Sequence, residues 1–280
     1  MTIEQQLQLA VQAVADAQAV FITAGAGMGV DSGLPDFRGT EGFWRAYPAV
    51  AKLGLSFEQM ANPEWFEKSP SLAWAFYGHR LELYRRTVPH GGFLQLLTLA
   101  AQKPGGYFVF TSNVDGQFQR AGFASERIVE CHGSIHHFQC CQNCTNNIWD
   151  AAEETIEVDP DVFRAREPLP HCATCSGLAR PNVLMFGDYH WLPHRTAVQE
   201  GNFSRWLCES AQHKRRLVVL EMGAGTAIPT TRYMSESVAA QFQCPLIRLN
   251  PREYNVPAGQ IGLPWGAAEG IAKIYQQLTQ

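Results

Sequence analysis

Four short, mostly apolar runs, each leading into a loop that contains glycine or asparagine, constrain the fold of this chain more than any other feature. Runs of this kind are typical of strands buried on both faces, as in a parallel sheet. Helical stretches lie between them, and another begins the chain, where Leu7, Val11 and Val14 recur at helical spacing. We therefore expect an α/β fold with a Rossmann-like, doubly wound parallel sheet, whose ligands bind at the carboxyl ends of the strands. The four runs are residues 19–23, 107–110, 217–220 and 246–249.

The composition argues against several other classes of protein. A hydrophobic fraction of 46% and a charged fraction of 17% are typical of a compact globular chain. The net charge of −4 lacks the basic character of nucleic-acid binders, and the only basic cluster, residues 214–216, is interpreted as a solvated entry to a strand. We find no signal-peptide pattern and no apolar run of about 18 residues. We therefore expect a cytoplasmic monomer that binds neither nucleic acid nor membrane.

The cysteines indicate a metal site in a small insert. Between residues 140 and 175 the chain becomes polar, acidic and rich in proline, with close cysteines at both ends. Without an export signal, such pairs favour metal over disulfides. Four thiolates form a closed tetrahedral zinc site, which is structural because no position remains for water. Cys172 and Cys175 form one pair, whereas CxxC spacing favours Cys141 over Cys140 as the partner of Cys144 in the other.

This change in composition divides the chain into two expected domains. Residues 1–135 and 177–280 form the Rossmann-like domain. Residues 136–176 form the zinc-binding insert, with a helical part of the small domain within residues 40–90. A mixed metal site is the less favoured alternative, and it would use His136, His137 or His171.

A glycine-rich loop follows the first apolar run. Its residues Gly25, Ala26 and Gly27 would let the backbone approach a pyrophosphate at the start of a helix. Alone this is a weak signal, because many strand-to-helix turns contain glycine and bind nothing. Pro35 disfavours helix at the residue before it, so we expect a structured loop that could close over the nicotinamide end of a dinucleotide. This loop carries Asp36, Phe37 and Arg38.

From this point the sequence resembles the sirtuin family. Residues 25–39, GAGMGVDSGLPDFRG, are similar to the first signature of that family. TSNVDGQFQRAG, ECHGS, two cysteine pairs, RPNVLMFGD, GAGT and LNP then follow in the family's order, so the resemblance spans roughly residues 20–270. It implies an NAD-dependent protein lysine deacylase, which consumes NAD as a co-substrate, acts on acyl-lysine peptides or proteins, and holds one structural zinc ion.

The resemblance also assigns the catalytic residues. His132 matches the general base, and an imidazole changes protonation near neutral pH, as activation of a ribose hydroxyl requires. Asn113 and Asp115 match the polar pair beside the nicotinamide ribose, which orients the ribose and a water molecule. The plainer alternatives are a structural histidine and ordinary turn residues after a strand.

Three positions depart from the family pattern. Ser112 stands where glutamine is usual, Phe118 where histidine is usual, and Gly29 where serine is usual. These changes concern the ribose pocket and therefore turnover. They keep two alternatives open: an ADP-ribosyltransferase or NAD hydrolase on the same scaffold, and a weakly catalytic NAD-sensing protein.

The remaining contacts to NAD and zinc also follow from the resemblance. The family's first zinc ligand lies eight residues after the catalytic histidine, which selects Cys140. Later loops would approach the adenosine half, and the alanine near the C-terminus would lie at the edge of the adenine. The expected zinc ligands are Cys140, Cys144, Cys172 and Cys175. The residues expected against NAD are Gly25, Ala26, Gly27, Asp36, Phe37, Arg38, Ser112, Asn113, Asp115, His132, Gly223, Gly225, Thr226, Asn250 and Ala267.

Two segments are expected to bind the acylated peptide. Residues 180–188 resemble the family's substrate segment, whose backbone could pair with a peptide, although an ordinary strand is the alternative. In that segment we expect Val183, Phe186 and Gly187 to contact substrate. Tyr77 and Arg80 would share a helix face, and in one sirtuin subclass such a pair binds the carboxylate of succinyl- or malonyl-lysine. More arginines follow in residues 81–86, so a solvated basic face is the alternative.

Overall fold

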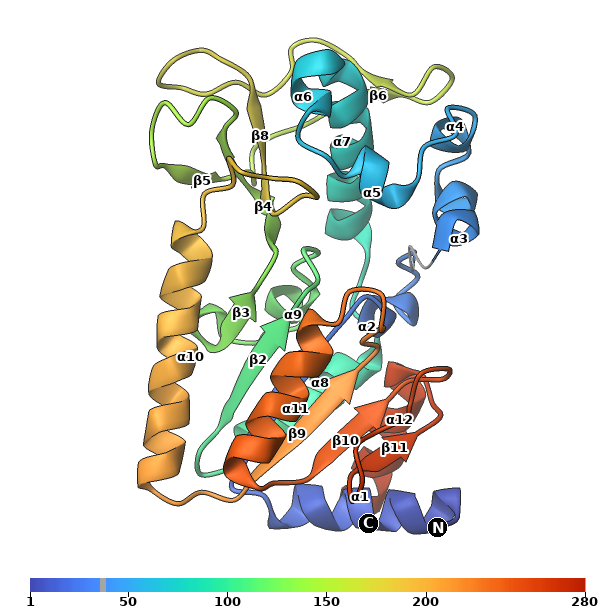
Figure 1. Cartoon of the computed structure of the whole chain (residues 1–280), viewed down its shortest axis with the longest axis vertical. Helices are drawn as coiled ribbons and strands as arrows, with labels where there is room; N and C mark the ends of the chain where they lie inside the picture. Colours follow the sequence, from blue (N-terminus) through green and yellow to red (C-terminus); the bar gives the residue numbers. More distant parts are fainter. Residues whose placement is uncertain (36–38, 280) are drawn as a thin grey trace.

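The computed structural model describes residues 1–35 and 39–279. Figure 1 shows a parallel sheet with its covering helices in the lower half and shorter helices and strands in the upper half, with both termini at the lower end. None of the described helices is both long enough and apolar enough to cross a membrane.

The main sheet has six strands in the order β11-β10-β9-β1-β2-β3, and every neighbouring pair is parallel. The four runs expected from the sequence are β1, β2, β9 and β10, so the predicted fold class is confirmed. The short β11 at one edge was not predicted, because three residues that include a glycine give no strand signal. The strands are β1 (Ala19–Ala24), β2 (Tyr107–Thr111), β3 (Ile128–Glu130), β9 (Leu217–Met222), β10 (Leu246–Leu249) and β11 (Ile261–Leu263).

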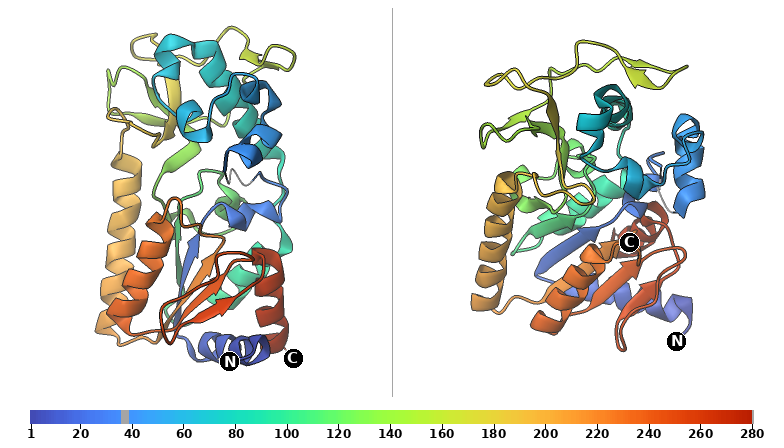
Figure 2. Two further views of the ribbon diagram at one scale, coloured as in Figure 1. Left: turned by 45° about the vertical axis from the view of Figure 1, so that its right-hand side comes forward. Right: turned by 45° about the horizontal axis from the view of Figure 1, so that its top comes forward.

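Helices cover both faces of this sheet, which explains why its strands are mostly apolar. Along β1 the side chains alternate: Val20 and Ile22 enter one core, and Phe21 enters the other. The first core lies under α1, α8 and α12, and the second under α10 and α11, where Phe21 stacks on Phe203 with ring centroids 4.9 Å apart. Figure 2 shows α10 and α11 on the same side of the sheet. These helices are α1 (Ile3–Asp16), α8 (Gly91–Ala101), α10 (His194–Gln212), α11 (Thr230–Phe242) and α12 (Ala267–Thr279).

The upper half has its own core and a three-stranded antiparallel sheet in the order β5-β4-β8. Trp74 and Phe138 join its helices to that sheet, with ring centroids 4.9 Å apart. The strands are β4 (Gly133–Cys140), β5 (Ile148–Asp150) and β8 (Ala179–Val183), with a hairpin of β6 (Val158–Asp159) and β7 (Arg164–Ala165). The helices are α3 (Gly39–Ala46), α4 (Pro48–Ala51), α5 (Phe57–Met60), α6 (Trp65–Lys68) and α7 (Pro70–Arg86).

Three short helical segments lie in the connections: α2 (Gly27–Val30), α9 (Gln117–Arg120) and the 3₁₀ turn η1 (Ser125–Arg127). Because all six strands of the main sheet are parallel, their carboxyl ends share one edge. The loops that carry most of the expected site residues therefore lie along that edge.

Candidate active site

The glycine loops after β1 and β9 are packed directly against each other. The Gly27 N–H donates to the Gly223 carbonyl at 3.0 Å. A Cβ added to Gly25 would lie 2.8 Å from Ala224 Cα, and one added to Gly223, where φ is +61°, would lie 2.4 Å from Gly27 Cα. Glycine is therefore required for this backbone contact. The structure thus brings together two loops that are about 200 residues apart in the sequence.

Asn113 lies against the first of these loops. Its side-chain amide donates to the Gly25 carbonyl at 3.0 Å, and its backbone N–H donates to Thr111 Oγ1 at 3.0 Å. The amide is thereby fixed at the carboxyl end of β2, next to the strand that bears the glycine loop. Asp36, Phe37 and Arg38, which were also expected here, lie outside the described residues.

His132 follows β3, the neighbour of β2. Burial of the half-buried imidazole lowers the pKa of His132, and a backbone hydrogen bond with Ser112 opposes that effect. The His132 carbonyl accepts the N–H of Leu184 at 2.9 Å, so its backbone is bonded to the segment expected to bind peptide. Because burial lowers the pKa of His132, the imidazole at neutral pH is mainly in the unprotonated form that a general base needs.

Asp115 is buried in the loop after β2. Burial raises the pKa of Asp115 to about 6; the Gln117 N–H, which donates to Oδ1 at 2.9 Å, and the charge of Arg80 lower it, whereas Glu130 raises it. Its backbone carbonyl lies 2.9 Å from His136 Nε2. From the sequence His136 was expected only as an alternative metal ligand, because its contact with Asp115 joins the loop after β2 to β4 and leaves no local pattern.

Each of the three residues that depart from the family pattern has different contacts with its neighbours. Phe118 is 2% exposed and packs against Phe93 and Phe123, each with ring centroids 5.0 Å away, so an apolar contact replaces a polar side chain. Ser112 Oγ accepts a hydrogen bond from Thr231 Oγ1 at 3.1 Å. At Gly29 a Cβ would lie 2.9 Å from the Leu34 side chain, so a serine there would require that side chain to shift.

The loops expected to bind the adenosine half lie at the ends of β9 and β10. Asn250 is fully buried, and its amide donates to the Ala224 carbonyl at 3.0 Å. The side chain of Thr226 is exposed, and its hydroxyl donates to Glu253 Oε1 at 2.5 Å. Ala267 is buried at the start of α12, beyond β11. Asn250 therefore acts within the protein in this structure, by holding the loop after β9.

Tyr77 and Arg80 lie on α7, buried among aromatic rings. Their exposed fractions are 1% and 5%, so the solvated-face alternative does not hold for Arg80. Arg80 Nε and Nη2 donate to Tyr84 Oη at 3.1 and 3.0 Å. Burial raises the pKa of Tyr77 to about 12, and its hydroxyl has no hydrogen-bond partner among the described residues. A buried hydroxyl donor thus lies on the same helix as a guanidinium group whose orientation Tyr84 fixes.

The expected peptide segment begins as β8, an edge strand of the small sheet. Beyond β8 the Phe186 N–H donates to the Ala61 carbonyl at 2.9 Å, and Gly187 adopts a φ of +69°. Arg180 and Asp188 form a buried ion pair across the segment, with Nη1 and Oδ1 3.0 Å apart. The Asp188 carboxylate therefore connects the far end of the segment to β8.

Four cysteines gather at the end of the small sheet. Their Sγ atoms all lie within 4.8 Å of one another, and the separations from Cys140 to Cys175 and from Cys144 to Cys172 are both 3.6 Å. Thiolates about 2.3 Å from a tetrahedral zinc ion would be ~3.8 Å apart, so this group fits zinc. Cys141 lies outside the group. No histidine belongs to it within the described part of the chain.

Taken together, these features define a class of protein: an α/β chain with a candidate site at the carboxyl edge of its parallel sheet and a cluster of four cysteines at the end of a small antiparallel sheet. The family model described as the Sir2 family matches residues 25–205, well over half of the chain. The chain therefore belongs to the Sir2, or sirtuin, family.

Several named relatives are similar over much of the chain. A Danio rerio protein named NAD-dependent protein deacylase sirtuin-5, mitochondrial, is 35% identical over 188 residues, which cover 62% of this chain and 58% of that protein. The chain thus spans less than two thirds of this relative. A Leptospira interrogans NAD-dependent protein deacylase is 30% identical over 84% of this chain and 82% of its own length. An Aquifex aeolicus protein of the same name is 27% identical over 91% and 93%.

Solved structures show the same fold. A crystal structure described as a Sir2 homolog–NAD complex superposes with a TM-score of 0.72 at 25% identity, covering 97% of this chain and 93% of that one. A second solved structure, described under the words "Structural Basis for the Mechanism and Regulation of Sir2 Enzymes", has a TM-score of 0.65 at 23% identity. This likeness supports the fold alone.

Proposed function

We propose that this protein is an NAD-dependent protein lysine deacylase that transfers the acyl group to ADP-ribose and releases nicotinamide. The observation that carries the proposal is the sheet edge where Asn113 contacts the first glycine loop and His132 contacts both Ser112 and the peptide segment. The similarity to relatives named NAD-dependent protein deacylases and to a Sir2 homolog–NAD complex supports the same function.

Each of the expected catalytic residues has its own role in the proposed reaction. NAD, consumed as a co-substrate, supplies the ribose to which the acyl group moves. His132 takes the proton of a ribose hydroxyl, because burial keeps its imidazole neutral. Asn113, held by the Gly25 carbonyl, orients the ribose and a water molecule. Asp115, when ionised, stabilises the positive charge that develops as the glycosidic bond breaks.

The pH dependence follows from two of these groups. Below about pH 6 the buried Asp115 carboxylate becomes protonated and loses the charge that it contributes. His132 also loses its basic form on the acid side, so both groups lower activity in the same direction. We expect kcat/KM to fall as the pH drops through about 6, where Asp115 titrates. A pH–rate profile of the wild type and Asp115→Asn checks this, and an acid limb well above neutrality would contradict it.

For the acyl group, we propose a preference for succinyl or malonyl over acetyl. The Arg80 guanidinium lies among aromatic rings. Its Cζ atom is 5.2 Å from the ring centroid of Phe76 and 5.6 Å from that of Tyr77. A carboxylate that reached this group would form charge-assisted hydrogen bonds where water screens them little. The buried Tyr77 hydroxyl supplies a further donor.

One assay tests both the reaction and the acyl preference. Nicotinamide release is measured without peptide and with acetyl-, succinyl- and malonyl-lysine peptides. We expect release to require peptide and the acidic acyl groups to be favoured by about tenfold or more. Arg80→Met should lower succinyl activity by ~10–100-fold and Tyr77→Phe by about tenfold, both affecting acetyl activity much less. Arg86→Met, an exposed arginine at the end of the same helix, is the matched control.

The outcomes separate the alternatives. Nicotinamide release that needs no peptide would contradict the deacylase proposal and favour the ADP-ribosyltransferase or NAD hydrolase that Ser112 and Phe118 keep open. Equal activity on acetyl and succinyl peptides would remove only the acyl preference.

Other expectations stay predictions. The division into residues 1–135 with 177–280 and residues 136–176 remains a proposal, which the separate core of the upper half supports. The small sheet extends slightly past these boundaries, since β4 begins at Gly133 and β8 ends at Val183. A cytoplasmic monomer without nucleic-acid or membrane partners also stays a prediction, although the sirtuin-5 relatives are named mitochondrial.

A further inference from the structure

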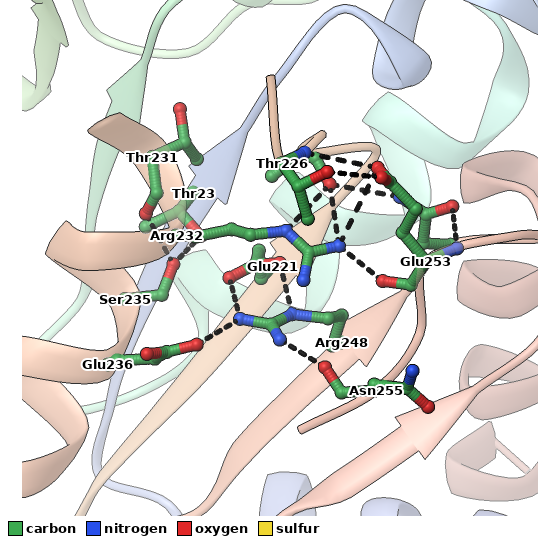
Figure 3. A network of polar contacts seen from close by, with 12 residues as sticks. Thr23, Glu221, Thr226, Thr231, Arg232, Ser235, Glu236, Arg248, Glu253 and Asn255 are labelled. Atoms are coloured by element: carbon green, nitrogen blue, oxygen red, sulfur yellow. Dashed lines mark hydrogen bonds and ion pairs between the residues drawn. The ribbon is translucent and has the colours of Figure 1, made fainter. Parts of the chain in front are cut away.

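A buried polar network lies beneath the loop that follows β9 (Figure 3). Its base is an ion pair between Arg248 on β10 and Glu221 on β9, which stand opposite each other in the sheet, with Nη2 and Oε2 3.0 Å apart. Arg248 Nη2 also donates to Glu236 of α11 at 2.8 Å. Beside it, Arg232 reaches from α11 toward the loop. Burial, and next the like charge of Arg248, lower the pKa of Arg232.

The Ala224 carbonyl is the point at which this network holds the loop. Arg232 donates to it from Nε at 3.2 Å and from Nη2 at 3.1 Å, and Asn250 donates from Nδ2 at 3.0 Å. The peptide bond between Ala224 and Gly225 is trans, so the Gly225 N–H points away from the carbonyl and from these donors. Gly225 and Thr226 are also the first residues of the loop that are not buried. The inward carbonyl therefore turns the Gly225 N–H toward the outer side of the loop.

Arg232 also holds a second loop in place. Its Nη2 donates to the backbone carbonyl of Glu253, in the loop after β10. The Glu253 carboxylate in turn accepts the Thr226 N–H at 3.2 Å and the Thr226 hydroxyl at 2.5 Å. One guanidinium group thus connects the two loops expected to meet the adenosine half of NAD. Arg232 itself is only 8% exposed, so it acts through those loops.

We propose that Arg232 is a positioning residue for the adenosine half of NAD. It holds the Ala224 carbonyl and the Glu253 backbone, so that the Gly225 N–H and the Thr226 side chain face the dinucleotide. This inference rests on the proposed use of NAD. A loop that is already ordered loses less conformational entropy when a ligand binds, so we expect Arg232 to affect the affinity for NAD. The chemistry at the nicotinamide end, which lies at the other loops, is left unchanged.

The test separates KM from kcat. In Arg232→Met we expect KM for NAD to rise about tenfold, with kcat at saturating NAD and KM for the acyl peptide within about twofold of wild type. Arg232→Lys keeps the charge but lacks the fork that reaches both carbonyls, so an intermediate rise of about threefold is expected. Arg205→Met, which removes an exposed arginine from α10, is the matched control.

Two results would overturn the inference: an unchanged KM for NAD in Arg232→Met, or equal changes in kcat and in both KM values, as general destabilisation would produce. If Arg232→Met does not fold, an unchanged KM for NAD in Arg232→Lys decides the question. The rise in melting temperature on adding NAD is measured as well. A wild type stabilised by NAD that releases no nicotinamide would refute the deacylase, and loss of that stabilisation in the variants would still support Arg232.

Discussion

Replacing His132 by alanine is expected to lower kcat/KM for deacylation by ~10²–10⁴-fold, the range that a positioned general base contributes. The imidazole is half-buried and its pKa is lowered by burial, so at neutral pH the wild type supplies a base that alanine cannot replace. The backbone contact from Leu184 to the His132 carbonyl does not depend on the side chain, so the peptide segment should stay in place. The loss should therefore appear mainly in kcat, measured by acyl-peptide turnover.

The same variant distinguishes the proposed steps. In the proposed reaction the carbonyl oxygen of the acyl-lysine attacks the anomeric carbon of the ribose as nicotinamide leaves from it. His132 then takes the proton of the neighbouring ribose hydroxyl, so it acts only after this first step. Peptide-dependent exchange of labelled nicotinamide into NAD should therefore survive in His132→Ala while deacylation is lost. His213→Ala, at an exposed histidine just after α10, is the matched control. If His132→Ala and wild type had the same activity, the weakly catalytic NAD-sensing alternative would replace the deacylase.

The main sheet could be predicted because its strands carry their own signal. Burial on both faces favours apolar residues at nearly every position, as in β1, and that pattern is visible without a partner strand. The strands of the upper half carry a weaker sequence signal, because β4 contains polar residues and the hairpin strands β6 and β7 have two residues each. Such strands are stabilised by the second core, and residues far apart in the sequence build that core.

The candidate site divides in the same way. Gly25 was predicted because a glycine loop after a strand is a local pattern, and Asn113 was predicted from the resemblance to the sirtuin family. Arg232 was missed, since it lies on a helix outside any glycine motif, and its role depends on where the loop after β10 folds. Tyr84 was missed as a partner of Arg80, because a tyrosine four residues along a helix is usually a core residue.

The cysteines offer the sharpest prediction, because the chain contains a matched pair. Cys140 is the last residue of β4 and belongs to the four-cysteine group, whereas the adjacent Cys141 does not.

We expect Cys140→Ser to lose about one zinc ion per chain and Cys141→Ser to retain it, as measured by metal analysis of freshly purified protein. Structural zinc contributes ~10–16 kcal/mol of binding free energy in small peptides, so its loss should lower the free energy of unfolding by about 4 kcal/mol or more. Because β4 runs from Gly133, next to His132, to Cys140, the effect should reach the active site and lower deacylase activity too. Zinc retained in Cys140→Ser, or lost in Cys141→Ser, would show that a different thiolate completes the site.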